Sequence, residues 1–390
     1  MIRREAETKL RELAAHFKAV AVIGPRQSGK TTLVKNVFSR KPYYSFENPD
    51  IRLWATDDPR GFLETVKDGA ILDEVQHVPH LFSYLQEILD NTTKKGLFIL
   101  TGSNNFLLEE KITQSLAGRI AYLKLLPFGI REIFHIVQDF SDDRLMWQGF
   151  YPPVYDQGIP PYDWVQNYIR TYVERDVRQI RNLRDLLPFE RFLRLLAGRT
   201  ATEWSAHALA SEAGVDTKTV QAWTGILVNS FLVFQLPPFY KNFNKRIVKR
   251  PKIYFFDTAL VCGLLHIREP EHLAWHPLRG QIFETMVVAD LMKYFYHRGM
   301  EPPLFYWRDK SGREIDLVMD TGKEIIPIEI KSGLTASPEW LKNLKYWQKL
   351  TGFTKGFILY GGKQKMTYTD GITLMNWREF MQKANKYIDI

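Results

Sequence analysis

The residues best suited to chemistry lie near the N-terminus, in the segment Gly-Pro-Arg-Gln-Ser-Gly-Lys-Thr from Gly24 to Thr31. This segment matches every fixed position of the phosphate-binding pattern G-x-x-x-x-G-K-[ST]. The two glycines let successive backbone N–H groups turn toward phosphate oxygens, Lys30 brings charge to the β- and γ-phosphates, and the Thr31 hydroxyl ligates Mg²⁺. The sequence therefore predicts a site for a nucleoside triphosphate. Its predicted binding residues are Gly24, Pro25, Arg26, Gln27, Ser28, Gly29, Lys30, Thr31 and Thr32.

Two carboxylates follow a second apolar run, residues 69–72, which is typical of a buried strand. We expect Asp73 to complete the Mg²⁺ shell and Glu74 to orient and polarise the attacking water. A further apolar run, residues 96–100, ends in small polar residues, where an open α/β sheet builds its ligand site. Ser103 or Asn104 could there sense the γ-phosphate through the attacking water.

One arginine is a candidate for a more distant contribution to this site. Arg119 stands just before the apolar run 120–125. It could reach the γ-phosphate within its own chain or from a neighbouring subunit. It could equally be a surface arginine beside a strand.

A second group of acidic residues lies in the last third of the chain. Glu284 falls in the amphipathic stretch 280–296, Asp316 in a strand-like run, and Glu329 and Lys331 in another. A hairpin between these runs, turning at residues 321–323, would place Asp316 beside Glu329. Paired carboxylates bind Mg²⁺ or Mn²⁺, and a lysine on the same strand face could position water or steady charge on phosphorus.

Elements of alternating type must position the nucleotide site. Strand-like runs at 19–23, 43–46, 70–73, 97–101 and 120–125 alternate with helical stretches at 30–38, 59–67 and 80–91. This order predicts an α/β fold with a doubly wound, largely parallel sheet.

The middle of the chain has a different character. Residues 151–161 are aromatic and proline-rich and read as a linker, followed by a helical pattern at 162–183. Arginines recur there every three residues, on a face that either is solvated or contacts nucleic acid. Residues 203–236 suggest a winged helix-turn-helix, and the basic segment 241–252 would be its wing. This module could contact DNA or only pack against the ATPase. The recurring arginines are Arg175, Arg178, Arg181 and Arg184.

Composition sets the outer limits. The formal net charge of +9 permits a polyanionic partner, and the single cysteine, Cys262, excludes an intrachain disulfide and a multi-cysteine zinc site. No apolar run approaches the ~20 residues that span a bilayer, and the N-terminus does not read as a signal peptide. We expect a cytoplasmic protein with no membrane partner.

Taken together, the residues Gly24–Thr32, the run Ile-Leu-Asp-Glu-Val-Gln, Leu-Thr-Gly-Ser-Asn and Leu-Ala-Gly-Arg resemble AAA-type ATP-binding proteins of archaea and bacteria, related to signalling ATPases. They most resemble the subset with a nuclease-like C-terminal domain. Glu284, Asp316 and the Glu329-Ile-Lys331 run resemble the PD-(D/E)XK nuclease core, with Ile315 where that signature has proline. The resemblance implies ATP rather than GTP.

We therefore expect three parts: a P-loop AAA-type ATPase domain at 1–140, lid helices and a winged helix at 141–252, and an α/β restriction-endonuclease-like domain at 253–390. In the main hypothesis, a Mg²⁺-dependent ATPase controls a DNA-binding or DNA-cleaving module. An ATP-driven switch without nuclease activity, which binds DNA or a protein partner, and a defence-type protein acting on RNA remain alternatives. A homo-oligomer also stays open.

Overall fold

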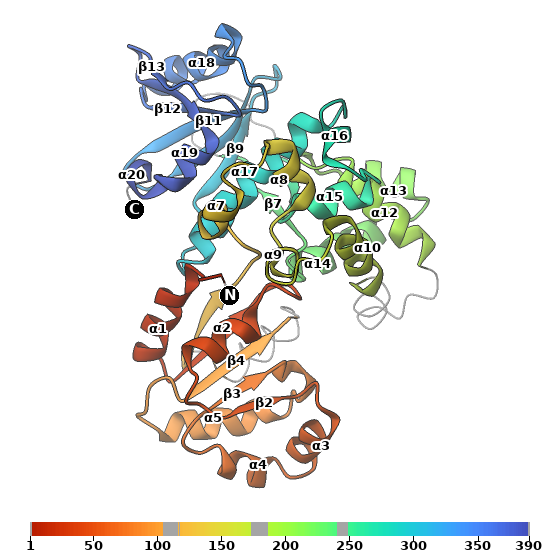
Figure 1. Ribbon diagram of the computed structural model, residues 1–390, viewed down its shortest axis with the longest axis vertical. Coiled ribbons are helices and arrows are strands. Elements are labelled where there is room, and N and C mark those ends of the chain that lie inside the picture. The colour runs from red at the N-terminus through yellow and green to blue at the C-terminus, as the bar shows by residue number, and fades with distance from the viewer. Residues whose placement is uncertain (1, 104–115, 117, 173–185, 240–248, 389–390) are drawn as a thin grey trace. The chain divides into compact units, whose positions relative to one another are not determined.

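The structure is a computed structural model that describes residues 2–103, 116, 118–172, 186–239 and 249–388 (Figure 1). The chain divides into two compact units. The first comprises Met1–Phe128, Asn229–Phe231 and Lys293–Glu301, and the second comprises Gly129–Val228, Leu232–Met292 and Pro302–Ile390. In the part of the chain that is described, no helix has both the length and the apolar character needed to cross a membrane.

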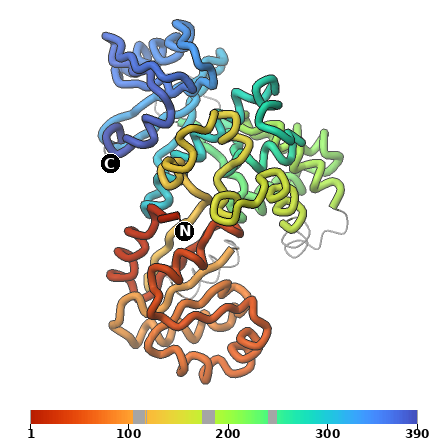
Figure 2. The backbone as a smooth tube through the Cα atoms, viewed as in Figure 1, coloured from red at the N-terminus to blue at the C-terminus, as the bar shows by residue number. Residues whose placement is uncertain are grey.

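A parallel sheet forms the centre of the first unit, drawn in red to orange in Figure 2. Its five strands are ordered β2-β3-β4-β1-β5, and every neighbouring pair is parallel. This confirms the predicted α/β class, and each predicted strand agrees with an observed one to within one residue at either end. The elements are α1 (Ala6–His16), β1 (Ala19–Ile23), α2 (Lys30–Val37), β2 (Tyr43–Ser45), α3 (Pro49–Asp57), α4 (Pro59–Thr65), β3 (Ala70–Asp73), η1 (Val75–His77), α5 (Leu81–Asn91), β4 (Phe98–Gly102) and β5 (Ile120–Lys124).

Burial explains why these residues form a sheet between helices. All five residues of β1 are apolar and buried, as expected for the central region of a parallel sheet covered on both faces. The helix α1, which is not among the predicted elements, buries Ala6, Leu10 and Ala14. Their spacing of four residues puts them on one helix face, where they join the core that contains β1 and α2.

The second unit begins with helices and a small sheet. The strands β6, β8 and β7 form an antiparallel three-stranded sheet, with β8 in the middle. Residue 252, where the expected middle domain ends, is the first residue of β8. The elements are α7 (Ile130–Val137), α8 (Asp142–Gln148), α9 (Pro152–Asp156), α10 (Pro161–Thr171), α12 (Leu187–Ala197), β6 (Thr202–Glu203), α13 (Ala206–Ala213), α14 (Thr217–Asn229), β7 (Val233–Leu236), β8 (Lys252–Phe255), α15 (Thr258–Leu264), α16 (Pro270–Leu273) and α17 (Arg279–Tyr296).

The segment expected to be a linker is instead part of the core of this unit. Tyr151 is fully buried, and its ring lies 4.5 Å from that of Trp164 and 5.1 Å from that of Tyr168, both on α10. Aromatic residues here therefore pack α9 against α10. Their large rings bury apolar surface, which a solvated linker would leave exposed. The expected helix continues past α10 into residues that lie outside the described ones, and so do the four arginines.

A mixed sheet of six strands ends the chain, in the order β13-β14-β12-β11-β10-β9. β10 and β11 are antiparallel neighbours, as the predicted hairpin requires, and β11 and β12 are parallel. Leu341, Leu344 and Trp347 of α18 join one core cluster with residues of this sheet. The elements are β9 (Leu304–Arg308), β10 (Glu314–Asp320), β11 (Ile325–Lys331), η3 (Pro338–Trp340), α18 (Leu341–Thr351), β12 (Gly356–Tyr360), β13 (Met366–Thr367), β14 (Ile372–Asn376), α19 (Trp377–Gln382) and α20 (Ala384–Tyr387).

Candidate functional site

The phosphate-binding loop, or P-loop, joins the end of β1 to the start of α2. A Cβ atom on Gly24 would lie 2.0 Å from the carbonyl oxygen of Leu125, so no side chain fits at this position. Gly29, the N-cap of α2, has a φ of 91°, a left-handed conformation that favours glycine. Gln27 is also left-handed, with a φ of 59°. The loop therefore has a fixed shape that ends at the N-terminus of a helix, where anions bind well.

Lys30 lies over this loop. Its Nζ atom donates hydrogen bonds to the carbonyl oxygens of Gly24, at 3.0 Å, and Pro25, at 2.8 Å. Burial lowers the pKa of Lys30, and the carboxylates of Glu74 and Asp73 oppose this effect. The loop carbonyls thus hold the ammonium group in place, where phosphate oxygens would be stronger partners for its charge.

Asp73, at the end of β3, accepts hydrogen bonds from hydroxyl groups on three other elements. Thr31 Oγ1 lies 3.0 and 3.2 Å from its two carboxylate oxygens, and the Tyr43 hydroxyl donates to it at 2.7 Å. Thr101, fully buried in β4, also donates to Asp73. Thr31 and Asp73 bring hard oxygen donors into contact, the type of ligand that Mg²⁺ prefers, so these two residues fit a Mg²⁺ ion.

Glu74 follows Asp73 in a left-handed conformation, with a φ of 53°. Its Oε2 atom accepts hydrogen bonds from the Ser103 hydroxyl, at 2.9 Å, the Ser103 backbone N–H, at 3.3 Å, and the Gln76 side chain. Burial disfavours the charged carboxylate, but the charge of Lys30 and these hydrogen bonds outweigh burial and lower the pKa of Glu74. The structure thus brings Ser103, Glu74 and Lys30 into one electrostatic group, with Glu74 ionised.

Arg119 is not brought to this group. It immediately precedes β5, whose first residue pairs with Ala19 at the start of β1, whereas the P-loop follows the other end of β1. At about 3.3 Å per residue, the five residues of β1 separate the two positions by about 16 Å. Arg119 forms an ion pair with Asp90 of α5. The expectation that it could act within its own chain is therefore corrected. Action on a neighbouring subunit remains a prediction, and so does the alternative of a surface arginine beside a strand, which the ion pair with Asp90 fits. Asn104 lies outside the described residues.

The carboxylates of the C-terminal sheet meet at a β-bulge. Ile315 pairs with Trp307 and Val318 with Phe305, so two residues of β10, Asp316 and Leu317, stand opposite one residue of β9. Bulges re-aim side chains and occur beside active sites. On the other side of β10, Leu317 pairs with Ile328. This register makes Asp316 the cross-strand neighbour of Glu329.

Three charged side chains are in contact here. Lys331 Nζ lies 2.6 Å from Glu329 and 3.1 Å from Asp316, and Asp316 also accepts the Ile330 backbone N–H at 2.7 Å. Burial and the charge of Asp316 raise the pKa of Glu329. Glu329 is 1% exposed, and its Oε1 atom is buried without a hydrogen-bond partner in the described residues. An unpartnered carboxylate oxygen beside a second carboxylate fits a divalent ion.

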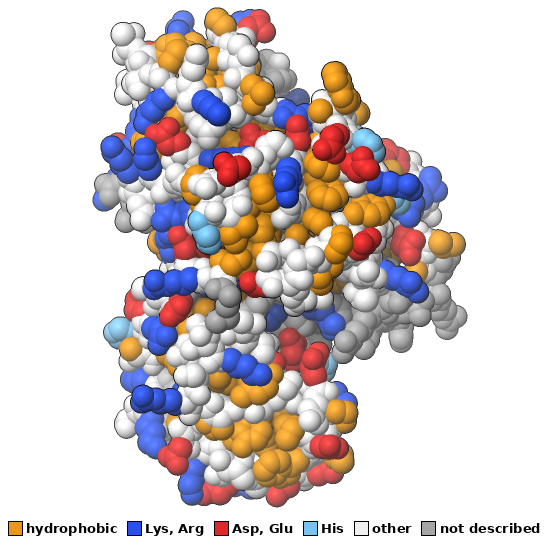
Figure 3. Space-filling model, in the orientation of Figure 1, with side chains coloured by type: hydrophobic (Ala, Val, Ile, Leu, Met, Phe, Trp, Pro, Cys, Tyr) orange, Lys and Arg blue, Asp and Glu red, His pale blue; other side chains and the backbone are white. Residues whose placement is uncertain are grey.

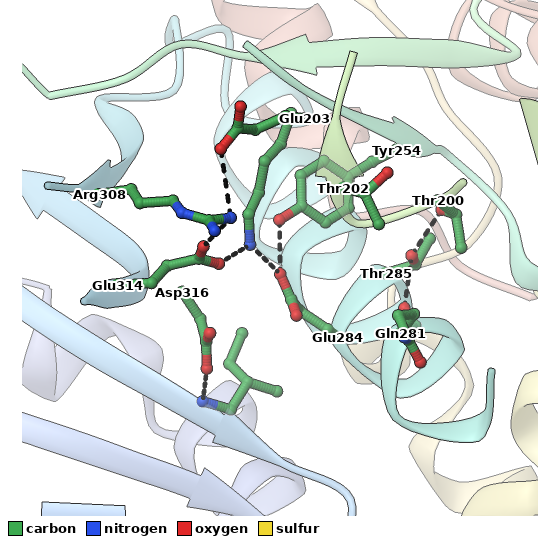
Figure 4. Close-up of polar contacts among 12 residues, drawn as sticks. Thr200, Thr202, Glu203, Tyr254, Gln281, Glu284, Thr285, Arg308, Glu314 and Asp316 are labelled. Atoms are coloured by element: carbon green, nitrogen blue, oxygen red, sulfur yellow. Dashed lines mark hydrogen bonds and ion pairs between the residues drawn. The ribbon is translucent and has the colours of Figure 1, made fainter. Parts of the chain in front are cut away.

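Glu284 of α17 belongs to a neighbouring set of contacts, shown in Figure 4. Its Oε1 atom accepts from Lys252 Nζ, at 3.0 Å, and from the Tyr254 hydroxyl, at 2.6 Å. Lys252 also forms an ion pair with Glu314. Among the described residues, no three His, Cys, Asp or Glu side chains are placed to hold a metal together.

Several contributing residues are not among the predicted site residues. Thr101 has a signal in the sequence, because it is a polar residue at the end of an apolar strand. Tyr43, Tyr254 and Glu314 have none, because each reaches its partner from a strand that only the fold brings near. Lys252 lies in the segment expected to be the basic wing, but it is buried and pairs with Glu284 and Glu314 instead.

Comparisons with known proteins agree with the first of these sites. The family model described as an AAA domain matches residues 16–134. A domain of unknown function, DUF8612, matches residues 141–271, and another, DUF4143, matches residues 279–380. The AAA match contains the P-loop, Asp73, Glu74 and Ser103.

Relatives extend over nearly the whole chain. Uncharacterized proteins of Mycobacterium tuberculosis and Mycobacterium bovis are each 29% identical over 374 residues, which cover 95% of this chain and 82% of theirs. A solved Walker-type ATPase of Pyrococcus abyssi is 16% identical, with a TM-score of 0.46, and covers 67% of this chain and 94% of its own. The AAA match, the P-loop and the parallel sheet make residues 16–134 an AAA-type P-loop ATPase domain.

Proposed function

We propose that this protein is a Mg²⁺-dependent ATPase whose nucleotide state controls a DNA-cleaving module, with cleavage carried by Asp316, Glu329 and Lys331. The observation that carries the proposal is the contact of Lys331 with both carboxylates, beside a buried Glu329 oxygen that has no hydrogen-bond partner in the described part of the chain. The two carboxylates can hold one metal ion, and the lysine beside them can position water for attack on phosphorus.

In the ATPase, Lys30 and the N–H groups of the P-loop bind the phosphates. Thr31 and Asp73 would hold Mg²⁺, and the ion would supply positive charge to the phosphates. Glu74, ionised and fixed by Ser103, orients and polarises the water that attacks the γ-phosphate. Arg119 could contribute only across a subunit boundary.

In the cleaving module, Asp316 and Glu329 would hold Mg²⁺ or Mn²⁺, and the ion would supply a Lewis acid for the scissile phosphate. The ammonium group of Lys331 stabilises the negative charge that develops on the phosphate oxygens in the transition state. It also orients the attacking water. The bulge at Asp316 supports this role, because bulges re-aim side chains beside active sites and the Asp316 carboxylate accepts hydrogen bonds from Ile330 and Lys331 of β11.

DNA binding is proposed for the helix pair α13–α14 and the β7–β8 hairpin. Ser205 caps α13, Gly214 ends it in a left-handed conformation, and Lys218 and Gln221 are exposed on α14. The three-stranded sheet beside the pair is the arrangement that a winged helix needs. Within the basic segment 241–252, the described residues are 249–252. Lys249 and Arg250 are exposed, whereas Lys252 is buried and does not belong to this surface. Among the residues drawn in colour on the face in Figure 3, Lys and Arg side chains are mixed with Asp and Glu side chains.

The test is cleavage of linear and supercoiled DNA with Mg²⁺ or Mn²⁺, with and without ATP, and with RNA in a parallel series. Wild type is compared with Asp316→Ala and Lys30→Ala. Loss of cutting in Asp316→Ala supports the cleaving module, and altered cutting in Lys30→Ala supports control by nucleotide. Cutting that persists in Asp316→Ala contradicts the proposal. Preferential cutting of RNA would make RNA, rather than DNA, the substrate.

The second candidate is an ATP-driven switch that binds DNA or a protein partner without cleaving. The contacts of Glu284 favour it, because Lys252 and Tyr254 both donate to its Oε1 atom, so the third acid of the nuclease pattern is engaged by partners of its own. ATP-dependent DNA binding in a gel-shift assay, with no cleavage under any metal condition, would select this candidate.

A further inference from the structure

The most deeply placed positive charge in the carboxylate region belongs to Lys252, the first residue of β8. This side chain is 3% exposed, and its Nζ atom is surrounded by oxygen atoms from two other elements. Glu284 of α17 lies 3.0 Å away, and Glu314 of β10 forms an ion pair with the same ammonium group (Figure 4). A buried lysine between two acids is held by charge as well as by hydrogen bonds.

The partners of Lys252 are themselves fixed. The Tyr254 hydroxyl donates to the same Glu284 oxygen at 2.6 Å, and Arg308 lies 3.2 Å from Glu314. The carboxylate oxygens of Glu284 and Glu314 are the donor type of a divalent-cation site, and the ammonium group of Lys252 pairs with both. Lys331 contacts a different pair, Asp316 and Glu329.

We propose that Lys252 acts as a built-in cation that limits the carboxylate cluster to one divalent ion, bound by Asp316 and Glu329, and withholds Glu284 from the metal. This inference rests on the proposed cleaving function for its metal, and it assigns Lys252 and Glu314 a role that the nuclease pattern does not contain. Lys252 is a positioning residue, because it acts through Glu284.

The test is Mn²⁺ binding by the full chain without nucleotide. Calorimetry and the electron paramagnetic resonance signal of Mn²⁺ measure the number of bound ions and their affinity. Any ion at the P-loop is common to all the proteins compared. Wild type is measured beside Lys252→Met, which keeps the length of the side chain without its charge. Lys252→Arg keeps the charge, and Lys249→Met removes an exposed lysine three residues away as the matched control.

We expect Lys252→Met to bind one ion more than wild type, or to bind Mn²⁺ at least about tenfold more tightly, because removal of the ammonium leaves Glu284 without its cation and Glu314 with Arg308 alone. Lys252→Arg and Lys249→Met should match wild type. Equal ion number and affinity in Lys252→Met and wild type would overturn the proposal.

A second comparison holds even if Lys252→Met does not fold. Glu284→Gln should change Mn²⁺ affinity by no more than about twofold, whereas Asp316→Asn should lower it by at least about tenfold. A loss in Glu284→Gln as large as that in Asp316→Asn would make Glu284 a ligand and overturn the proposal.

The two proposals fail in different ways. If wild type has no ion that depends on Asp316, the metal-dependent cleavage proposed above loses its basis. A gain of an ion in Lys252→Met would still support Lys252 as the internal cation. If wild type binds an Asp316-dependent ion and Lys252→Met gains nothing, cleavage survives and the role of Lys252 does not.

Discussion

The guanidinium of Arg4 donates a hydrogen bond of 2.6 Å to the carbonyl oxygen of Ser28, within the P-loop. A second bond of the same length joins Arg4 to the carbonyl oxygen of Leu126, and the guanidinium lies 4.8 Å from the ring centre of Phe128. Arg4 is 7% exposed. The N-terminal segment therefore stabilises the P-loop through the buried guanidinium of Arg4, a residue outside the P-loop sequence pattern.

Replacing Arg4 should weaken nucleotide binding. Hydrogen bonds from charged groups contribute about 1.5–3 kcal/mol each, so Arg4→Ala should raise the KM for ATP by at least about tenfold. Arg4→Lys should recover only part of the loss, because one ammonium group cannot reproduce the planar fork. ATP hydrolysis measured over a range of ATP concentrations checks both.

The matched control is Arg3→Ala. Arg3 is next in sequence, its side chain is 83% exposed, and it lies 3.9 Å from Glu7 on the surface. Equal KM and kcat in Arg4→Ala and Arg3→Ala would show that support from Arg4 does not matter for the loop.

Glu74→Gln should separate binding from hydrolysis. The amide keeps the size of the side chain but cannot polarise water as a carboxylate does, so kcat should fall by about 10²–10⁴ while ATP still binds. Fluorescent nucleotide binding and phosphate release are the two measurements. Glu64→Gln, which changes an exposed carboxylate paired with Lys67, is the control and should hydrolyse ATP like wild type. A Glu74→Gln variant with normal kcat would remove Glu74 from the mechanism.

Thr101→Val should raise the Mg²⁺ concentration needed for half-maximal hydrolysis by about tenfold. The change keeps the shape of the buried side chain, but it removes a donor to Asp73 and the acceptor, 3.2 Å away, for the Glu74 backbone N–H. Thr224→Val is a fair comparison, because that buried hydroxyl bonds only to the Val220 carbonyl of its own helix at 2.8 Å in the contacts described. An unchanged Mg²⁺ requirement in Thr101→Val would contradict the prediction.

Gly24→Ala should abolish ATP binding, because the new methyl group would lie 2.0 Å from the Leu125 carbonyl oxygen and the backbone of the loop or of residue 125 would have to move. Gly214→Ala provides the contrast. Gly214 is left-handed, with a φ of 75°, but nothing lies within 4 Å of a Cβ there. It should cost about 1 kcal/mol of stability and leave ATP binding intact. Nucleotide affinity and thermal unfolding distinguish the two, and ATP binding retained in Gly24→Ala would refute the packing argument.

Local sequence by itself determined the P-loop, the strand that feeds it and the acidic strand. Each of these depends on neighbours in the chain: five apolar residues make β1, Gly29 caps α2, and Asp73 ends β3 just before Glu74. The hairpin that pairs Asp316 with Glu329 is also local, because a turn of a few residues sets the register of two strands.

Tertiary structure decided what no short segment contains. Arg4 reaches Ser28 across 24 residues, and Lys252 reaches Glu284 across 32. Arg119 lies at the N-terminal end of the parallel strands, and the P-loop lies at their C-terminal end, because β5 runs parallel to β1. The bulge at Asp316 depends on how β9 meets β10. Charges and hydrogen bonds act through space over a few ångströms, so residues far apart in sequence acquire their partners only when the chain has folded.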